Sequence, residues 1–245
     1  MSLPRFYVPE TASFFTGRVP LPPDAAHHAG RALRLATGEK VALFNGSTPC
    51  YWRGTIRFEG KNAWVQIEKE VPSENESPLH ITLVQALVSP EKLDWIVEKA
   101  VELGVSEIVL TPAHRSVTRL QGERLRKRLE KCRETIRAAC EQCGRNILPT
   151  IRAVSKLREV WQLQADVRFI MAPGSSTPAQ LTPNTKNILF AIGPEGGFSP
   201  EEIQKAQDAG WTSALLGPRV LRTETAGLAC IVWANTLAGD FPNSL

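Results

Sequence analysis

Residues 187–226 read NILFAIGPEGGFSPEEIQKAQDAGWTSALLGPRVLRTETA. The apolar run at 188–192 has the length of a buried strand. It ends in GPEGG, residues 193–197, where glycines let the backbone approach a ligand closely. The next four residues, SPEE at 199–202, place serine at an N-cap, proline at the first helical position and glutamate three residues after the cap. The pattern predicts a strand, a glycine loop and a helix with a capping box.

A second strand is predicted at 213–216, and it breaks at the Gly217-Pro218 pair. The octapeptide RVLRTETA, residues 219–226, then leads into the last predicted helix. Two strand-to-loop connections in one sheet favour a ligand site at their shared edge, as in other open α/β sheets.

The first 72 residues are predicted to form a small β-rich unit, because three segments alternate and are rich in β-branched or aromatic residues. These strands are expected at 40–44, 51–58 and 63–69. A helix capped by Asp24 should precede them, with an inner face formed by Ala26, Gly30, Leu33 and Ala36. The polar segment VPSENESP, residues 71–78, indicates a linker, so we expect domains at 1–72 and 73–245.

From residue 79 onward, strands alternate with helices, which predicts a parallel α/β sheet. A helix capped by Ser89 should end at Gly104 and bury the stripe Leu93, Ile96, Val97, Ala100 and Val101. The last helix should bury Ala226, Cys230, Trp233 and Leu237. Further strands are expected at 81–88, 107–110, 149–153 and 167–172.

The composition is that of a globular chain, with 42% hydrophobic and 22% charged residues. The net charge of +4 and pI near 8.9 suit an anionic partner. No apolar run reaches the roughly 18 residues of a membrane span, so we expect a cytoplasmic protein with no membrane partner. The five cysteines include one CxxC without a second pair, and we expect no metal.

Basic residues gather in two places outside the glycine loops. In the N-terminal unit they are interleaved with aromatic residues. The segment between residues 115 and 137 contains nine basic and three acidic residues. Both patterns suit RNA, because arginines hold phosphates and aromatic rings stack on unpaired bases. The alternative is a solvated basic surface. The candidate RNA-binding residues are Arg5, His28, Arg31, Arg34, Arg124 and Arg128.

Six segments in order resemble the ribosomal RNA small subunit methyltransferase E family: RFYV, HHAGRALRL, LVQALVSPEKLDWIVEKAVELGV, AACEQCGR, GPEGGFSPEE and LGPRVLRTETA. The resemblance implies a SPOUT methyltransferase that transfers a methyl group from S-adenosylmethionine (SAM) to N3 of one uridine of 16S rRNA. It also implies an N-terminal PUA-like β-barrel, a C-terminal trefoil knot in an α/β domain, and a homodimer that acts on the small ribosomal subunit.

SAM carries a sulfonium, an adenine and an amino-acid tail but no phosphate, so its site should offer apolar walls and backbone groups. The loops fit this chemistry, and neither a P-loop nor a dinucleotide fingerprint is present. Glu195 could bind the tail of SAM or brace its loop, and we favour bracing. The candidate cofactor-binding residues are Met171, Pro173, Gly193, Pro194, Glu195, Gly196, Gly197, Leu216, Gly217, Val220, Leu221, Thr225 and Ala226.

Uridine N3 is a weak acid, so a methyltransferase must stabilise its anion, remove its proton, or both. Our hypothesis assigns Arg222 to the developing charge on a uracil oxygen. Glu141 and Arg145, from EQCGR, would position the base or accept its proton. The hydroxyls of Thr223 or Thr225 could instead serve as a plain N-cap.

Two other functions fit the same residues. One is a SPOUT methyltransferase for another RNA or another atom. The other is a ribosome-assembly factor that binds rRNA and no longer catalyses a reaction.

Overall fold

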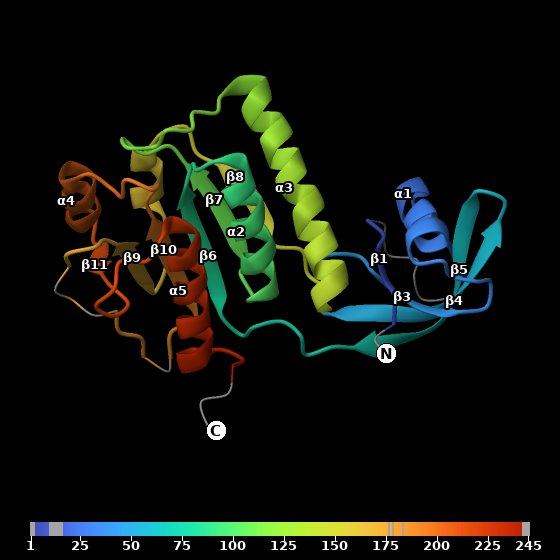
Figure 1. The fold of residues 1–245 in the computed structure, drawn as a ribbon. Coiled ribbons are helices and arrows are strands. Elements are labelled where there is room, and N and C mark those ends of the chain that lie inside the picture. Colours follow the sequence, from blue (N-terminus) through green and yellow to red (C-terminus); the bar gives the residue numbers. More distant parts are fainter. Residues whose placement is uncertain (1–2, 10–16, 176, 178, 183, 242–245) are drawn as a thin grey trace. The chain divides into compact units, whose positions relative to one another are not determined.

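Two compact units make up the chain in the computed structural model (Figure 1). One unit contains residues 1–76 and 140–148, and the other contains 77–139 and 149–245. The residues that the structure describes are 3–9, 17–175, 177, 179–182 and 184–241.

The first unit is built on a five-stranded sheet of order β1-β3-β4-β5-β2. β1 pairs with β3 in parallel, and the other pairs are antiparallel. All three predicted strands are confirmed, and two short strands were missed. The bounds are β1 Arg5–Tyr7, β2 Gly17–Pro20, β3 Lys40–Phe44, β4 Cys50–Glu59 and β5 Asn62–Pro72.

The sheet buries one face because apolar side chains recur at every second position. In β4 the inward positions are Trp52, Gly54 and Ile56, and the register shifts at Arg53/Gly54 in a β-bulge. The side chains of Trp52 and Ile56 join Phe6 and Val65 in the core of the unit.

The helix of the first unit is shorter than predicted. α1 spans Pro23–His27 and continues as a π-helical turn, His28–Ala32. Pro22 is at the N-cap and Asp24 lies inside the first turn, so the predicted Asp24 cap is wrong. The predicted inner face is confirmed at Ala26 and wrong at its other three positions. The buried positions are Ala26 and Ala29, whereas Gly30, Leu33 and Ala36 are exposed.

The second unit contains a six-stranded sheet of order β11-β9-β10-β6-β7-β8, in which every pair is parallel. The carboxyl ends of β9, β10 and β11 therefore meet at one edge, as predicted. The bounds are β6 His80–Ala86, β7 Glu107–Thr111, β8 Thr150–Ala153, β9 Val167–Met171, β10 Asn187–Ile192 and β11 Thr212–Ala214.

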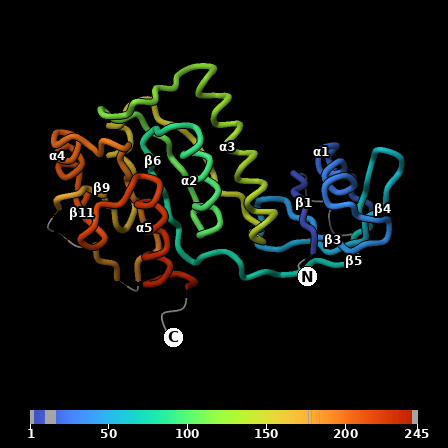
Figure 2. The backbone as a smooth tube through the Cα atoms, in the orientation of Figure 1, coloured from blue at the N-terminus to red at the C-terminus, as the bar shows by residue number. Residues whose placement is uncertain are grey.

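Five helical segments accompany this sheet, and Figure 2 traces the chain from β10 through α4 and β11 into α5. α2 and α5 pack side by side, and α5 lies against β10 and β6 (Figure 1). The bounds are α2 Pro90–Glu102, α3 Gly122–Cys143, a 3-10 helix Leu157–Gln162, α4 Pro200–Asp208 and α5 Thr223–Ala238.

Helix α2 confirms its predicted stripe, since Leu93, Ile96, Val97, Ala100 and Val101 are all buried. Gly104 follows its end with φ at +92°, the left-handed conformation that favours glycine. Ser89 occupies the predicted N-cap position, but its side chain makes no capping hydrogen bond.

Helix α5 buries a different face from the predicted one. Cys230 is buried, but Leu237 is 43% exposed, so the predicted stripe is partly wrong. The buried residues are Thr223, Gly227, Leu228, Cys230, Ile231, Ala234 and Asn235. The sequence pattern failed here because the helix is apolar on most sides and carries little amphipathic signal.

None of the five cysteines forms a disulfide, and the described residues contain no group of side chains that could hold a metal ion. Among the helices in the described ranges, none has the length and apolar character needed to cross a membrane.

The carboxylate of Glu76 holds the segment 140–148 within the first unit. Its Oε2 accepts hydrogen bonds from Nε and Nη2 of Arg145 at 3.0 and 2.9 Å. Its Oε1 accepts from the backbone N of Asn146 and Ile147 at 2.9 and 3.0 Å. The ion pair is largely buried, with 7% of the Arg145 side chain and 16% of the Glu76 side chain exposed.

We predict that Glu76→Gln destabilises the first unit by about 3 kcal/mol, because breaking a buried ion pair leaves an uncompensated charge. Urea unfolding would measure the loss. Glu74→Gln is the matched control, since Glu74 is exposed. Equal stability of the two variants would show that the Glu76 contacts contribute nothing.

Candidate active site

A cavity of about 640 Å³ opens at the carboxyl edge of the parallel sheet. Its size falls in the range of about 300–1,000 Å³ that is typical of small-molecule sites. Three segments at the ends of neighbouring strands form its walls, within 171–175, 192–197 and 214–226, and Lys92 of α2 and Cys230 of α5 complete the lining.

The first wall is the glycine loop that follows β10. A Cβ on Gly193 would lie 2.9 Å from the backbone N of Phe198 and 3.0 Å from Gly197, so the loop folds back too tightly for any other residue. Gly197 has φ at +66°, and its N donates to Pro194 O at 2.8 Å. The predicted capping box then begins α4, with Ser199 and Glu202 bonded reciprocally at 3.2 and 2.8 Å.

The outer side of this loop is held by the segment after β7. Arg115 Nη1 donates to Gly196 O at 2.9 Å. The backbone N of His114 donates to Oε1 of Glu202 at 2.7 Å. The loop is therefore fixed by contacts from outside the cavity.

Thr223 ties the loop to the start of α5 and to β6. The residue is buried, and its Oγ1 donates to Gly193 O at 2.6 Å and accepts from Nε2 of Gln85 at 3.0 Å. Thr223 is the first helical residue and Arg222 occupies the N-cap position without a side-chain cap, so neither threonine of RTETA acts as the N-cap.

Hydrogen bonds join the segment that follows β9 to the end of β11, and so connect the other two walls. Ala172 N donates to Ala214 O at 3.1 Å, and Ser175 Oγ donates to Ser213 O at 2.8 Å. Gly217 turns the second of these segments, with φ at +77°.

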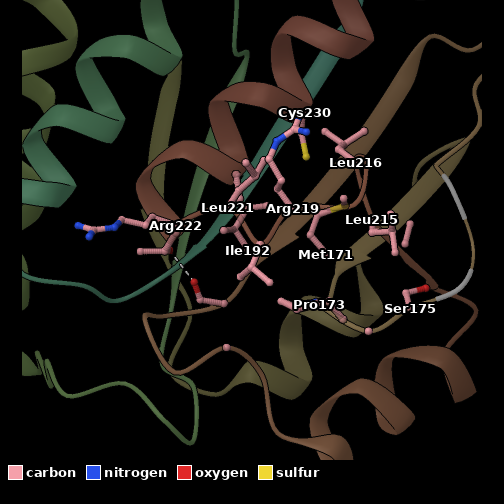
Figure 3. A pocket seen from close by; sticks show the side chains of 18 of the residues that line it. Met171, Pro173, Ser175, Ile192, Leu215, Leu216, Arg219, Leu221, Arg222 and Cys230 are labelled. Atoms are coloured by element: carbon pink, nitrogen blue, oxygen red, sulfur yellow. Dashed lines mark hydrogen bonds between the residues drawn. The ribbon is translucent and has the colours of Figure 1, made fainter.

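Apolar side chains fill the middle of the lining. Met171, Ile192 and Leu221 lie together in Figure 3, and Leu216 and Cys230 also line the cavity. Burial raises the pKa of the Cys230 thiol, so it stays protonated at neutral pH.

One cation and two carboxylates gather at another part of the lining. Lys92 Nζ lies 2.9 Å from Oε1 of Glu195 and 3.6 Å from Oε2 of Glu224. The hydrogen bond to Glu195 raises the pKa of Lys92, and the charge of Glu224 adds to the rise. Burial by itself would raise the pKa of Glu195, but the hydrogen bond from Lys92, a backbone hydrogen bond and the charge of Lys92 together outweigh burial and hold that pKa below its ordinary value. Lys92 and Glu195 therefore carry their charges at neutral pH.

Most of the predicted cofactor-binding residues come together in this cavity. Gly196 and Thr225 are the two that do not line it. A Cβ on Gly196 would meet the Arg115 side chain at 3.1 Å, and Thr225 is exposed. The lining includes Met171, Pro173, Gly193, Pro194, Glu195, Gly197, Leu216, Gly217, Val220, Leu221 and Ala226. The contact of Glu195 with Lys92 is in keeping with a bracing role.

The three predicted catalytic residues lie in different surroundings. Arg222 lines the cavity, but its side chain extends away from Met171, Ile192 and Leu221 (Figure 3). Glu141 and Arg145 belong to the first unit and are not among the lining residues. Oε1 of Glu141 accepts from the backbone N of Tyr7 at 2.8 Å, and Arg145 is bound by Glu76.

Four of the predicted RNA-binding residues have exposed side chains, and the other two, Arg5 and Arg128, pack against residues of their own unit. His28, Arg31 and Arg34 are exposed, as is Arg124 on α3.

Arg5 is built into the first unit. Its guanidinium lies 5.2 Å from the Phe44 ring centroid and 5.3 Å from that of Tyr51. Burial lowers the pKa of Arg5 from its ordinary high value.

Arg128 is built into the second unit. It forms an ion pair with Asp94 at 2.6 Å and donates to Pro90 O at 2.9 Å, with 11% of its side chain exposed.

Sequence reasoning missed several groups at the cavity. Lys92 lies in the first turn of α2, after β6, and the rule that parallel strands end at one edge would have pointed to it. Glu224 was inside the quoted RTETA motif but was given no role. Thr223 was considered only as a cap, although its buried hydroxyl joins three segments.

We predict that Thr223→Val lowers the free energy of unfolding by about 1–3 kcal/mol, because the shape is kept while Gly193 O and Gln85 Nε2 lose a partner. Chemical unfolding would measure the loss, and the exposed Thr225→Val is the control. An unchanged stability of Thr223→Val would contradict the bridging role.

Known proteins resemble this chain over nearly its whole length. The RNA methyltransferase domain model matches residues 75–235. The ribosomal RNA small subunit methyltransferase E of Buchnera aphidicola (subsp. Acyrthosiphon pisum) is 33% identical over 88% of this chain and 86% of its own. That of Bacillus subtilis is 28% identical over 84% of each chain.

Two solved structures are similar throughout. A putative methyltransferase from Legionella pneumophila, in complex with SAM, has a TM-score of 0.92 and 32% identity, covering 98% of this chain and 100% of its own. A ribosomal RNA small subunit methyltransferase E from Neisseria gonorrhoeae, bound to SAM, has a TM-score of 0.90 and 35% identity with the same coverage. The chain therefore belongs to the ribosomal RNA small subunit methyltransferase E family.

Proposed function

We propose that this protein transfers a methyl group from SAM to N3 of one uridine of 16S rRNA in the small ribosomal subunit. The observation that carries the proposal is the cavity at the carboxyl edge of the sheet, in a chain that matches SAM-bound family members along its length. We infer that the reaction takes place in the cytoplasm, because its substrate is the small ribosomal subunit.

The lining fits SAM. Met171, Ile192, Leu216 and Leu221 offer apolar contact for an adenine, and the glycine loop brings backbone groups close. Glu195 places negative charge where a sulfonium or an ammonium can be accommodated. When bound, SAM supplies an electrophilic methyl group.

We infer that the three wall segments are the crossings of a trefoil knot. Support comes from the strand order, in which β10 lies between β9 and β6, and from the hydrogen bonds that join 172–175 to 213–214.

We also infer that the five-stranded sheet belongs to a PUA-like barrel. The β-bulge at Arg53/Gly54 supports this, because bulges bend strands and increase twist.

The domain at 1–72 would bind rRNA, and the domain at 73–245 would bind SAM and the reacting base. Exposed His28, Arg31 and Arg34 suit contacts with rRNA phosphates. Arg124, exposed on α3, suits the same role from the second domain.

We infer a homodimer from apolar side chains that stay exposed on the adjacent helices α2 and α5. Trp95, Val232 and Leu237 are 45%, 37% and 43% exposed. Exposed apolar surface of this kind is typical of association sites.

In this mechanism the chain must hold N3 in line with the methyl carbon and stabilise the anion that forms when N3 loses its proton. Arg222 is an exposed cation at the cavity that would reach a uracil oxygen. Glu141 and Arg145 would position the base, although their present contacts with Tyr7 and Glu76 hold the 140–148 segment in place.

The test is transfer of labelled methyl from SAM into small subunits that carry unmethylated 16S rRNA, with tRNA and large subunits alongside. We expect label in the small subunit alone, at N3 of one uridine. Label in tRNA would contradict the target and leave a methyltransferase for another RNA. SAM binding without transfer to any of these would contradict the reaction, and absence of SAM binding would favour an rRNA-binding assembly factor.

We predict that Arg222→Ala lowers kcat about 10²–10³-fold at saturating SAM and rRNA, since one lost donor to a developing anion has this effect. The control is Arg158→Ala, because Arg158 is also an exposed arginine but lies on the 3-10 helix and not at the cavity. Turnover that survives in Arg222→Ala would refute the assignment.

A further inference from the structure

The carboxylate of Glu224 is an open hydrogen-bond acceptor at the cavity. Its Oε2 is buried and has no hydrogen-bond partner among the described residues. Lys92 Nζ lies 3.6 Å from Oε2, which is an ion-pair distance but longer than a hydrogen bond. Glu224 lies in the first turn of α5.

The other titratable groups that line the cavity are poor proton acceptors. Lys92 is held in its charged form by Glu195 and Glu224. Cys230 is held as a thiol by burial. Arginines do not release their protons in proteins, which excludes Arg219 and Arg222.

Glu195 differs from Glu224 in two ways. Its Oε1 already accepts the hydrogen bond from Lys92 at 2.9 Å, and its side chain is 42% exposed, against 20% for Glu224. A proton acceptor needs a free oxygen lone pair and a partly desolvated site, and Glu224 has both.

We propose that Glu224 is the general base that takes the N3 proton of the target uridine, and that Lys92 is the residue that positions it. This rests on the function proposed above and names the residue for its proton-transfer step. The N–H bond breaks and its proton passes to the Glu224 carboxylate. The N3 electron pair forms the bond to the methyl carbon, while the carbon–sulfur electron pair stays on sulfur to give a neutral thioether.

The surrounding charges suit this step. Lys92 approaches Glu224 from α2, Glu195 approaches Lys92 from the glycine loop, and Arg222 precedes the helix. Lys92 Nζ is at hydrogen-bond distance from Glu195, 2.9 Å, but 3.6 Å from Oε2 of Glu224, so this oxygen keeps its acceptor capacity. Two cations, Lys92 and Arg222, are then available to a uracil oxygen as negative charge develops.

The experiment compares Glu224→Gln with wild-type protein in methyl transfer to small subunits between pH 6 and 9. Glutamine keeps the shape of the side chain but cannot take a proton. We expect kcat at pH 7 to fall about 10²–10⁴-fold, while the Kd for SAM changes less than threefold. The residual kcat of Glu224→Gln should rise about tenfold per pH unit, because it depends on uridine that is already ionised. The wild-type rate should rise less steeply.

Two further variants make the result specific. Glu201→Gln removes an exposed carboxylate from the first turn of α4, so it controls for a lost charge at a helix start, and its kcat should match the wild type. Glu224→Asp keeps a carboxylate, and it should restore the shallow pH profile with an intermediate rate.

Other outcomes would overturn the proposal. A Glu224→Gln protein that keeps its kcat but binds SAM weakly would show that Glu224 binds the cosubstrate. A reduced kcat with the same pH profile as the wild type would show a merely structural role. Failure of the wild-type protein itself to methylate small subunits would instead contradict the proposed function.

Discussion

One buried hydroxyl holds the cavity together. Oγ1 of Thr223 donates to Gly193 O and accepts from Nε2 of Gln85, so it joins the glycine loop, the start of α5 and the end of β6. β6 lies more than a hundred residues before the other two segments in the chain. The carbonyl of Gly193 and the side-chain amide of Gln85 are polar groups that need partners when they are buried. A single side chain that both donates and accepts meets this need without adding a charge. The shape of the cavity then follows from the loop that it fixes.

The charges at the cavity are arranged differently from those on the basic surfaces. Lys92, Glu195 and Glu224 form one mixed cluster whose members are held by each other. The cluster brings an oxygen without a hydrogen-bond partner, Oε2 of Glu224, close to the charged Lys92. This pair suits a reaction in which removal of a proton creates an anion. A purely basic cavity would suit a phosphate ligand, and a purely acidic one would repel the developing charge.

Much of the second unit could be predicted because local signals agreed with tertiary packing. The α2 stripe, the capping box at Ser199 and the strand edge at the glycine loop depend on spacing that the chain itself displays. The α1 helix was mispredicted because Pro22 and Pro23 start it earlier than Asp24, and a π-helical turn then changes its period. Lys92 and Glu224 were missed because their meeting depends on the packing of α2 against α5, which no local pattern encodes.

The basic residues show why a count of charges is a weak guide to a binding surface. Five cations of α3 form ion pairs with three glutamates on the same helix, Glu123, Glu130 and Glu134. Such exposed ion pairs are weak, so RNA phosphates can replace the glutamates as partners of these cations. Arg128 is different, because its guanidinium is buried against Asp94 and Pro90 O, and withdrawing it would break the contact of α3 with α2. The number of arginines in a segment therefore overstates the charge that RNA can reach, and exposure decides which of them are available.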